Sequence, residues 1–456
     1  MSDFVWSDRT IRRALSLRMD IVDPDLVFTG VSTDSRKIEE GHLYVALTGT
    51  RFDGHDFVAD AVSKGASGAV VSRQPTSQTD TKLYPVDDTL SALGSLASHR
   101  REQLKARVVA ITGSSGKTTT KDFTAAALSS SKRVHATQGN LNNRIGMPLT
   151  LLATPDDAEA VVLEVGSSEP GEISALAHVA KPDIAVVTTV GESHLEKLGS
   201  LEGVIQEKLG LLCGLAEGGL CIVGDEPPVL AEEAREVCHH LRVAGWSERA
   251  DEDLRPEAAD VDVFGRYEFQ WRGQKVTVPL MGRHAVVDAM LALAIADLLG
   301  VSPKDAAQGL ASAEANPLRG EVQRIGMLTL IVDCYNANPQ SVRAALDVLE
   351  GQGPAARRVA VLGTMLELGD ASERLHKEVF GDALDRSVDL IVATGAFQEA
   401  AELLGAARGK EVITAADWKV AYPELRERLN GDEIVLLKGS RGVALEGIIP
   451  LLTRDF

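Results

Sequence analysis

The segment VVAITGSSGKTTTKDF, residues 108–123, restricts the possible folds of this chain more than any other. Four apolar residues lead into two glycines, and a lysine and three threonines follow the second glycine directly. An apolar run that turns on glycines into a helix is typical of a buried parallel strand followed by a phosphate-binding loop. The common pattern G-x-x-x-x-G-K-[ST] is not met, because Ile111 stands where its first glycine would be. The segment therefore predicts a nucleotide site of a narrower class.

Further apolar segments alternate with helical stretches and predict an α/β chain of three domains. Residues 1–105 hold the strand-like segments GHLYVAL, SGAVVS and KLYPVDD and the helical run HDFVADAVSKGA, which indicate a small N-terminal α/β domain. Residues 106–316 hold the near-continuous apolar strands RVVAIT, AVVLEV and DIAVVTTV. Such strands are typical of parallel sheets covered on both faces, so we expect a central P-loop-type ATPase domain here.

The last third of the chain repeats this alternation. Residues 317–456 contain the segments LTLIVD, RRVAVLG, DLIVATG, EVITA and EIVLLKG with helical stretches between them. They predict a C-terminal Rossmann-like, doubly wound domain. Within the central domain, the segment GRYEFQWRGQKVTVPL instead predicts a β-hairpin that turns at Arg272 and Gly273.

Composition argues against several classes of protein. The 456 residues carry a net charge of −19, which disfavours a general attraction to nucleic acid or anionic lipid. No apolar stretch approaches the roughly 18 residues that a membrane span needs. The first residues mix charges along their length and do not resemble a secretory signal, so we expect a cytoplasmic protein. Four cysteines without a C-x-x-C pair argue against a zinc cluster or a disulfide framework.

The glycine loop offers several kinds of phosphate ligand. Gly113 and Gly116 would let backbone N–H groups approach phosphate oxygens. Lys117 would supply a cation, and Thr118 would offer its hydroxyl to Mg²⁺. The alternative is a strand-to-helix turn with a fortuitous lysine. We favour the phosphate loop because Gly-Lys-Thr opens the helix directly.

Two further polar residues follow the ends of apolar strands. Glu164 ends the segment AVVLE, and His194 lies on the loop after DIAVVTTV. In open parallel sheets, ligands bind beyond the carboxyl ends of the strands. Taken singly, Glu164 has a structural ion-pair partner as its less favoured alternative, whereas for His194 a loop histidine with satisfied hydrogen bonds is at least as good an interpretation as a ligand. Together with the glycine loop, they predict a site for a metal and a nucleotide.

Lys208 lies in an apolar stripe. The segment SLEGVIQEKLGLLCGL, residues 200–215, predicts a helix with one apolar face. That face is formed by Leu201, Val204, Ile205, Leu212 and Leu215, and Lys208 falls within it. A buried lone ammonium group is costly. The side chain therefore either reaches outward to solvent or has a partner or a modification on its nitrogen.

Several motifs resemble the Mur ligases, the ATP-dependent amide-forming enzymes of peptidoglycan synthesis. The pattern T-G-x-x-G-K-T-T at residues 112–119 is similar to their ATP loop, with the same two-residue spacing between glycines. Longer stretches are similar to the family member that adds D-alanyl-D-alanine to UDP-N-acetylmuramoyl-tripeptide. They are TDSRKIEEGHLYVALTGTRFDGHDF, GNLNNRIGMPLTLL, SHLEKLGSLEGV, DCYNANPQSVRAALDVL, VLGTMLELGDASERLHKEV and LLKGSR.

The resemblance implies that this chain is a three-domain cytoplasmic ligase that activates the tripeptide carboxylate with ATP as an acyl phosphate. D-Alanyl-D-alanine and UDP-N-acetylmuramoyl-tripeptide would be its substrates, ATP and two magnesium ions its cofactors, and the molecule a monomer. Two alternatives stay open. One is a sister ligase with another amine or acid, and the other is a nucleotide-binding module without catalysis.

The resemblance also implies roles for single residues. Lys117 would contact the transferred phosphate, Thr118 and Glu164 would hold one magnesium ion, and His194 would hold a second. Lys208 matches a lysine that these ligases carbamylate, and its carbamate would help to place magnesium. Lys117, Glu164, His194 and Lys208 form the implied catalytic set. The implied ATP-binding residues are Gly113, Ser114, Ser115, Gly116, Lys117, Thr118, Thr119, His284, Asp288, Arg319, Asp333, Tyr335 and Asn338.

Substrate contacts follow from the same comparison of motifs. Asp34, Ser35 and Arg36 match the region that holds the uridine moiety. The residues that match the remaining substrate contacts are Asn140, Asn142 and Asn143, at the muramoyl-peptide end, and Asn336, beside the nucleotide. Each asparagine alone is also a normal turn or helix-cap residue. Diaminopimelate and lysine both remain open as the third residue of the tripeptide.

The chain departs from the family pattern at a few positions. It has GRHAVVD where similar ligases have GRHN and a later Asn, which places Ala285 and Asp288 at positions associated with the adenosine. Thr364 replaces the Asp of LGDMLELG, and Arg144 replaces a residue that is commonly acidic. These changes bear on the adenine and dipeptide contacts and leave the phosphate and metal residues intact.

Overall fold

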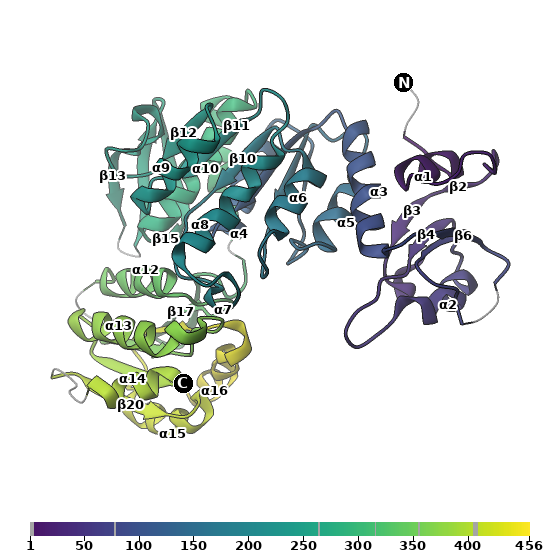
Figure 1. Cartoon of the computed structure of the whole chain (residues 1–456). Coiled ribbons are helices and arrows are strands. Elements are labelled where there is room, and N and C mark those ends of the chain that lie inside the picture. Colours follow the sequence, from purple (N-terminus) through teal and green to yellow (C-terminus); the bar gives the residue numbers. More distant parts are fainter. Residues whose placement is uncertain (1–3, 77–78, 263–264, 315, 354–355, 405–408) are drawn as a thin grey trace.

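Figure 1 shows the computed structural model, which describes residues 4–76, 79–262, 265–314, 316–353, 356–404 and 409–456. Three α/β units follow one another along the chain, each built around its own sheet with parallel strands. The expected fold class is therefore confirmed. The predicted domain limits at 105 and 316 fall in the connections between these sheets and stay predictions as boundaries. Among the described residues, no helix is long and apolar enough to cross a membrane.

The N-terminal unit contains a four-stranded parallel sheet in the order β3-β4-β5-β6. Its strands are β3 (Gly30–Ser32), β4 (His42–Val45), β5 (Gly68–Val71) and β6 (Lys82–Pro85). Its helices are α1 (Asp8–Ala14), α2 (Val58–Ser63) and α3 (Thr89–Gln103). β1 (Trp6–Ser7) and β2 (Val27–Phe28) form a separate antiparallel pair. The three strand segments and the helix predicted here are confirmed.

The central unit contains a six-stranded parallel sheet in the order β12-β11-β10-β7-β9-β8. Its strands are β7 (Arg107–Thr112), β8 (Val134–Ala136), β9 (Ala160–Glu164), β10 (Ile184–Val187), β11 (Leu220–Gly224) and β12 (Leu241–Ala244). Its helices are α4 (Lys117–Ser129), α5 (Gly146–Leu152), α6 (Glu172–Ala180), α7 (Leu195–Leu198), α8 (Leu201–Leu209), α9 (Pro228–Val237), α10 (Arg283–Leu298) and α11 (Pro303–Ala311).

Both faces of the central sheet are buried, as its near-continuous apolar strands require. Val108 and Ala110 of β7 point into a core that includes residues of α6. Val109 and Ile111 point into a second core, which contains residues of α4 and α10. Helices on both faces leave the carboxyl ends of the strands free for ligands.

The predicted hairpin of the central unit is confirmed. β14 (Arg266–Trp271) and β15 (Gln274–Met281) pair antiparallel, and β13 (Glu257–Val261) adds a third strand that was not predicted. Arg272 and Gly273 form the turn with φ angles of 47° and 72°. Two successive left-handed residues are the requirement of a type I′ turn, whose twist matches that of the strands.

The third unit contains a six-stranded sheet in the order β16-β17-β21-β18-β19-β20. Its strands are β16 (Glu321–Ile325), β17 (Leu328–Asp333), β18 (Arg358–Leu362), β19 (Leu390–Thr394), β20 (Glu411–Ala415) and β21 (Ile434–Lys438). Its helices are α12 (Pro339–Glu350), α13 (Ser372–Asp385), α14 (Ala396–Leu404), α15 (Trp418–Arg428) and α16 (Ile449–Asp455). The five predicted strands are confirmed. The antiparallel edge strand β16 was missed because its sequence, EVQRI, carries few apolar residues.

The helix predicted over residues 200–215 is shorter than expected. α8 ends at Leu209, and a 3₁₀ helix follows over Gly210–Gly214. Gly214 approaches the backbone of α6 so closely that an added Cβ would lie 2.3 Å from the carbonyl carbon of Ala177. This close approach, together with the low helix propensity of glycine, accounts for the early end of α8.

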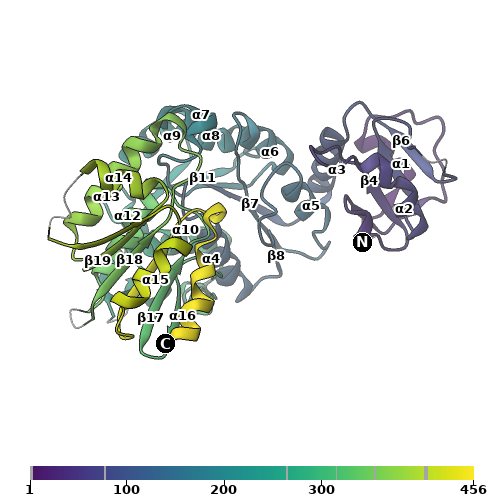
Figure 2. The same cartoon turned by 90° about the horizontal axis from the view of Figure 1, so that it is seen from below.

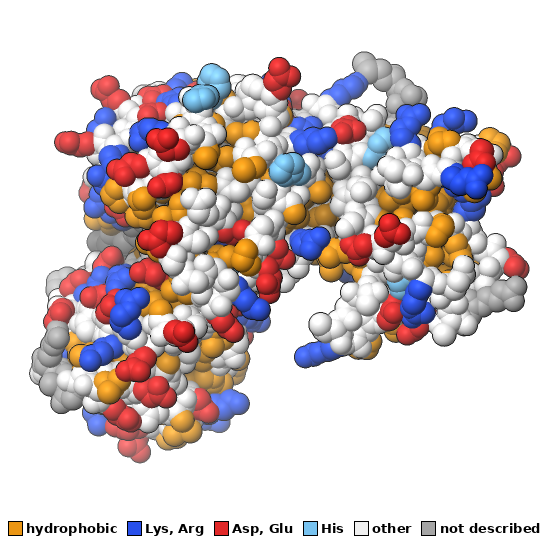
Figure 3. All heavy atoms as spheres, in the orientation of Figure 1, with side chains coloured by type: hydrophobic (Ala, Val, Ile, Leu, Met, Phe, Trp, Pro, Cys, Tyr) orange, Lys and Arg blue, Asp and Glu red, His pale blue; other side chains and the backbone are white. Residues whose placement is uncertain are grey.

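The central unit contacts both of its neighbours. Leu149 and Leu152 of α5 pack against the core of the N-terminal unit. On the other side, Leu195 and Leu198 of α7 lie within the main core of the third unit. Both ribbon views place the N-terminal unit apart from the third unit (Figure 2). In the space-filling view an open gap separates these two outer units (Figure 3).

Candidate active site

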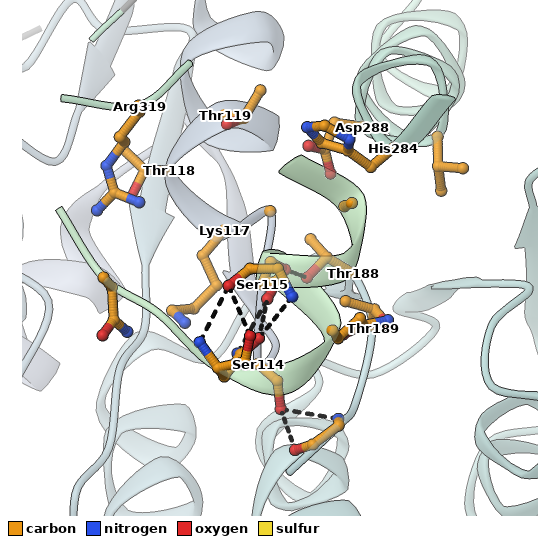
Figure 4. A pocket seen from close by; sticks show the side chains of 18 of the residues that line it. Ser114, Ser115, Lys117, Thr118, Thr119, Thr188, Thr189, His284, Asp288 and Arg319 are labelled. Carbon is orange, nitrogen blue, oxygen red and sulfur yellow. Dashed lines mark hydrogen bonds between the residues drawn. The ribbon is translucent and has the colours of Figure 1, made fainter. Parts of the chain in front are cut away.

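A cavity of about 1080 Å³ lies between the central and third units at the carboxyl ends of the central strands. Figure 4 shows Lys117 and Ser115 of the glycine loop with Arg319 on one side and His284 and Asp288 on the other. The sequence-predicted residues that line the cavity are Ser114, Ser115, Gly116, Lys117, Thr118, Thr119, Asn140, Asn142, Asn143, Glu164, His194, His284, Asp288, Arg319, Asp333, Tyr335, Asn336 and Asn338.

The glycine loop is held by the segment that follows β10. Gly113 has a φ of 148°, and an added Cβ there would lie 2.0 Å from Thr188 Oγ1, so no side chain fits. The Thr188 hydroxyl donates to the carbonyl of Ser115 at 2.5 Å. Ser114 Oγ donates to the carbonyl of Gly191 at 3.1 Å. These contacts hold the loop rigid before any ligand arrives, which favours electrostatic binding of an anion.

Lys117, the first residue of α4, lies at the bottom of the cavity. Its Nζ donates to the carbonyl of Gly113 at 2.6 Å, which curls the side chain over the loop. Gly113 itself does not line the cavity, although its carbonyl takes part in this contact. Burial lowers the pKa of Lys117, while the nearby Glu164 acts in the opposite direction. A phosphate group in the cavity would replace the carbonyl as a stronger partner for the ammonium.

Glu164 is the buried carboxylate at the end of β9, with 2% of its surface exposed. Thr118 Oγ1 donates to Oε2 at 2.9 Å, and Asn142 Nδ2 donates to Oε1 at 2.7 Å. The backbone N–H of Glu164 donates to Thr137 Oγ1 at 3.0 Å. No Lys or Arg among the described residues forms an ion pair with it, so the structural ion-pair alternative is wrong. Asn142, expected at the substrate, lines the cavity and also orients this carboxylate.

His194 lines the cavity from the loop before α7. Its Nδ1 lies 2.5 Å from Oε2 of Glu367, which belongs to the third unit. A hydrogen bond from His194 lowers the pKa of Glu367. The residue that sequence reasoning associated with a metal therefore also bridges two units. Glu367 lies in the quoted stretch VLGTMLELGD, but nothing in the sequence indicated this partner.

Lys208 is almost completely buried, with 1% of its surface exposed. Its Nζ donates to Ser167 Oγ at 3.0 Å, and Ser167 lines the cavity while Lys208 does not. The structure thus contradicts the alternative in which this side chain reaches out to solvent. Burial, together with the charge of Lys117, lowers the pKa of Lys208 to about 7. A large share of this amine is therefore neutral and nucleophilic near neutral pH.

The third unit contributes cations and amides to the cavity. The guanidinium of Arg319 stacks 3.9 Å from the centre of the Tyr335 ring. Asp333 Oδ2 lies 2.9 Å from Nζ of Lys438, which also donates to the carbonyl of Asn336 at 2.7 Å. Lys438 was not among the predicted site residues. It ends a predicted strand within the quoted stretch LLKGSR, so a test for polar residues at strand ends would have found it.

Two side chains of the third unit contact the phosphate loop region directly. Asn338 Nδ2 donates to Ser115 Oγ at 3.1 Å, and Asn338 Oδ1 accepts from the N–H of Ser341 as the N-cap of α12. Gln340 Nε2 donates to Thr189 Oγ1 at 2.8 Å. Gln340 was not predicted. These contacts tie the start of α12 to the nucleotide loop.

Asp288 lies in α10 behind the glycine loop. Its Oδ1 accepts from Thr120 Oγ1 at 2.9 Å, and 5% of its surface is exposed. Burial raises its pKa to about 7. An added Cβ at Gly116, whose φ is 81°, would lie 2.4 Å from this oxygen. His284, one turn earlier in α10, lines the same side of the cavity.

The predicted uridine residues lie outside the cavity. Asp34, Ser35 and Arg36 belong to the N-terminal unit, and the cavity lining contains no described residue before Ser114. Hydrogen bonds from Arg36 lower the pKa of Asp34 to about 2, so its carboxylate is ionised. These three residues were expected in the N-terminal unit, and their role at the uridine moiety stays a prediction.

Two of the asparagines serve local structure. Asn143 Oδ1 accepts from the N–H of Gly146 at 2.9 Å at the start of α5. Asn336 Oδ1 accepts from the N–H of Ala337 at 2.9 Å. These two contacts are those of ordinary turn or helix-cap asparagines, the alternative to a role in substrate binding. Both residues, like Asn140, also line the cavity.

The donor atoms around the cavity suit magnesium bound together with phosphate. Among the described residues, no group of three or more His, Cys, Asp or Glu side chains could hold a metal by itself. Thr118 Oγ1 and Glu164 Oε2 provide two hard oxygen donors 2.9 Å apart beside the glycine loop. Mg²⁺ typically takes one or two protein oxygens and completes its shell with water and substrate phosphates. The residues present fit that pattern.

Three family models match the chain in order. They are the Mur ligase family catalytic domain at residues 27–101, the Mur ligase middle domain at 111–296 and the Mur ligase glutamate ligase domain at 319–441. The UDP-N-acetylmuramoyl-tripeptide–D-alanyl-D-alanine ligase of Bacillus subtilis is 38% identical over 437 residues, 93% of each chain. The Escherichia coli enzyme of the same name is 35% identical over 448 residues. This match spans 96% of this chain and 97% of the E. coli chain.

Solved structures agree over the full length. A crystal structure of MurF from Acinetobacter baumannii superposes with a TM-score of 0.89 at 31% identity and covers 100% of both chains. The MurF ligase of Thermotoga maritima in complex with ADP gives a TM-score of 0.82 at 28% identity, covering 95% of this chain and 99% of its own. From the three consecutive family matches and these full-length relatives, the chain belongs to the Mur ligase family.

Proposed function

We propose that this chain is an ATP-dependent ligase that joins D-alanyl-D-alanine to UDP-N-acetylmuramoyl-tripeptide in peptidoglycan synthesis. The full-length relatives in B. subtilis and E. coli carry the name of this activity. The observation that carries the proposal is the convergence of Lys117, Glu164 and the third-unit Arg319 on one cavity. A phosphate loop, a buried carboxylate and a cation are parts that phosphoryl transfer to a carboxylate needs.

The reaction has two chemical steps. A carboxylate oxygen of the tripeptide attacks the γ-phosphorus of ATP, and ADP leaves with the electrons of the broken P–O bond. The amine nitrogen of D-alanyl-D-alanine then attacks the acyl phosphate carbon, phosphate leaves, and the nitrogen loses a proton. In both steps negative charge grows on oxygen, and the loop N–H groups, Lys117 and Arg319 would stabilise it. The reaction requires no nucleophile from the protein.

Magnesium would bind beside the glycine loop. Thr118 and Glu164 would hold one ion and His194 a second, and Asn142 would orient Glu164 for this role. When bound, Mg²⁺ would neutralise charge on the transferring phosphoryl group. The Thermotoga relative was solved in complex with ADP, which supports nucleotide binding by this chain.

We further propose that Lys208 carries a carbamate. The neutral amine would attack the carbon of CO₂, form an N–C bond and release a proton, which leaves an anionic group beside the metal residues. Its burial and its pKa near 7 support this reaction. A carbamate would also remove the cost of a buried ammonium group.

Carbamylation is testable by isotope labelling. With ¹³C-bicarbonate, wild-type protein should give a carbamate carbon signal that Lys208→Ala lacks. Lys208→Ala should also lose most of its turnover, and a short carboxylate such as acetate should restore part of it. Sodium chloride at equal ionic strength is the control. Unchanged turnover in Lys208→Ala would contradict the assignment.

Substrates would reach the cavity from two sides. Asp34, Ser35 and Arg36 would hold the uridine end on the N-terminal unit, and Asn140 would meet the peptide end. Both ATP and a UDP-linked precursor are cytoplasmic metabolites, so we place a monomeric enzyme in the cytoplasm. Closure of the outer units over the substrate would exclude water that hydrolyses an acyl phosphate.

The direct test is phosphate release from ATP with UDP-N-acetylmuramoyl-tripeptide, measured with and without D-alanyl-D-alanine. We expect multiple turnovers only with both substrates. The acceptor should be tested in diaminopimelate and lysine forms, and the amine against a panel of single amino acids. Faster turnover with another amine would favour a sister ligase, and nucleotide binding without release for any pair would contradict catalysis.

A further inference from the structure

We propose that Glu367 of the third unit is a positioning residue for His194. In this inference, docking of the third unit brings the Glu367 carboxylate onto Nδ1 of the imidazole and leaves Nε2 as the free nitrogen facing the site. The inference rests on the proposed function, in which His194 holds magnesium. It adds that the metal site is complete only when the third unit is docked.

The contact between the two side chains is direct and partly shielded. His194 Nδ1 lies 2.5 Å from Glu367 Oε2, with 19% of the His194 side chain and 55% of the Glu367 side chain exposed. Within the described residues, Nε2 has no hydrogen-bond partner. The carboxylate accepts a hydrogen, so it selects the tautomer that carries the proton on Nδ1.

Both residues are held in an uncommon backbone conformation. His194 has a φ of 54° and Glu367 a φ of 64°, in the left-handed region that non-glycine residues rarely adopt. Such conformations are strained for non-glycine residues and persist where the surroundings enforce them. Two of them facing each other across one contact indicate that both loops are shaped to bring these side chains together.

A backbone contact links the same two loops. The N–H of Glu196 donates to the carbonyl of Glu367 at 3.1 Å. Gly369, with a φ of 54°, lies so close that an added Cβ would be 3.0 Å from Cα of Glu196. The loop of the third unit is thus seated on the first turn of α7.

Apolar packing also ties the loop that carries His194 to the third unit. Leu195 and Leu198, in the helical turn that follows His194, lie in the same core cluster as Met365 and Leu368, on either side of Glu367. Burial of these side chains favours the docked state. The position of His194 is therefore coupled to domain docking through both its neighbours in sequence and its partner in space.

Orientation of a ligating imidazole by a carboxylate has a known energetic effect. A carboxylate bound to the ring nitrogen that does not ligate the metal sets the tautomer and raises the basicity of the ligating nitrogen. Loss of that carboxylate commonly weakens metal binding about 10-fold to 100-fold. A contact with a purely structural role would hold the units together without changing the tautomer. The two possibilities therefore differ in a measurable way.

The experiment compares Glu367→Ala, Glu367→Gln and the control Asp370→Asn, an exposed position in the same loop. Mn²⁺ binding to the full-length protein saturated with ADP is measured by electron paramagnetic resonance. Glu367→Ala should weaken Mn²⁺ binding about 10-fold or more. Glu367→Gln, whose amide oxygen still accepts from Nδ1, should weaken it less, and Asp370→Asn should leave it unchanged.

A second readout follows the imidazole itself. With ¹⁵N-histidine labelling, the wild-type shifts of His194, assigned with His194→Ala, should report a proton on Nδ1. Glu367→Ala should move the population toward the other tautomer. An unchanged tautomer together with unchanged Mn²⁺ binding in Glu367→Ala would overturn the inference.

A double-variant cycle separates this inference from the proposed function. If His194→Ala weakens Mn²⁺ binding and Glu367→Ala adds nothing in that background, Glu367 acts through His194. If His194→Ala weakens binding but Glu367→Ala does not, only the positioning role is wrong. If His194→Ala has no effect, the metal role of His194 is overturned, and the positioning role with it.

Discussion

Lys208 and Asp288 are two ionisable side chains whose charges are decided by burial. Burial penalises the charged form of each, which lowers the pKa of the lysine and raises that of the aspartic acid, both to about 7. Neither has an ion-pair partner among the described residues. Sequence reasoning identified Lys208 from its place in an apolar stripe. It identified Asp288 as an implied ATP-binding residue and as a departure from the family pattern, without its unusual chemistry.

The pKa of Asp288 predicts a pH-dependent stability. Its folded-state pKa of about 7 exceeds the ordinary 3.8, so the folded state holds a proton that the unfolded state loses. Stability therefore falls as pH rises from about 4 to about 7, by at most about 4 kcal/mol. Asp288→Asn, which can still accept from Thr120, removes this loss. Its melting temperature should exceed that of the wild type by more at pH 8 than at pH 5.

The control for this measurement is Asp370→Asn, because Asp370 is exposed. Its melting temperature should track the wild type at both pH values. An equal gain of Asp288→Asn at pH 5 and pH 8 would mean that the carboxyl is ionised throughout and that burial does not raise its pKa.

At the scale of elements, two glycines that precede helices of the central unit differ in what surrounds them: Gly116 in the glycine loop and Gly171 before α6. Gly116 and Gly171 both precede helices, with φ angles of 81° and 83°. An added Cβ at Gly116 meets Asp288 at 2.4 Å, whereas nothing lies within 4 Å of one at Gly171. A side chain at Gly171 would meet backbone strain alone, whereas one at Gly116 would also clash with Asp288.

This comparison predicts unequal effects of two alanine substitutions. Gly171→Ala should cost about 1 kcal/mol, because only the left-handed conformation is penalised. Gly116→Ala should lower stability further and weaken ADP binding at least 10-fold, since either the loop or Asp288 must move. Thermal melting and ADP titration measure both variants. Equal losses would show that the loop absorbs the added methyl group.

At the scale of the whole molecule, the nucleotide site is completed by contacts between units. The side-chain oxygen of Asn338 caps α12, and its side-chain nitrogen donates a hydrogen bond to Ser115 Oγ. One side chain thus serves both the stability of the third unit and its docking on the phosphate loop. Substitutions can separate these two functions.

Asn338→Ser should keep the cap, since serine is nearly as good an N-cap as asparagine, but it is too short to reach Ser115. Loss of one hydrogen bond of about 1 kcal/mol predicts roughly five-fold weaker ADP binding with little change in melting temperature. Asn338→Ala should lower both. If serine and alanine have the same effect on melting, the cap does not contribute as described.

Sequence reasoning could name residues that line the cavity from both units, but it could not name the contacts that individual side chains make across the two units. Glu164 and the glycine loop follow apolar strands of one sheet, so the topology alone brings them together. Gln340 and Glu367 come from another sheet, and their contacts with Thr189 and His194 require two units in one relative position. Lys438 ends a predicted strand and could have been named from the sequence.

The amino-acid sequence by itself determined the three α/β units, the buried parallel strands and the phosphate loop, because hydrophobic periodicity and glycine positions act locally along the chain. Only the tertiary structure decided that Lys208 is buried beside Ser167, that Asn142 serves Glu164, and that His194 meets a carboxylate from the third unit. Burial, ionisation and partner choice depend on neighbours that are distant in sequence, and these neighbours are set by packing between elements and units.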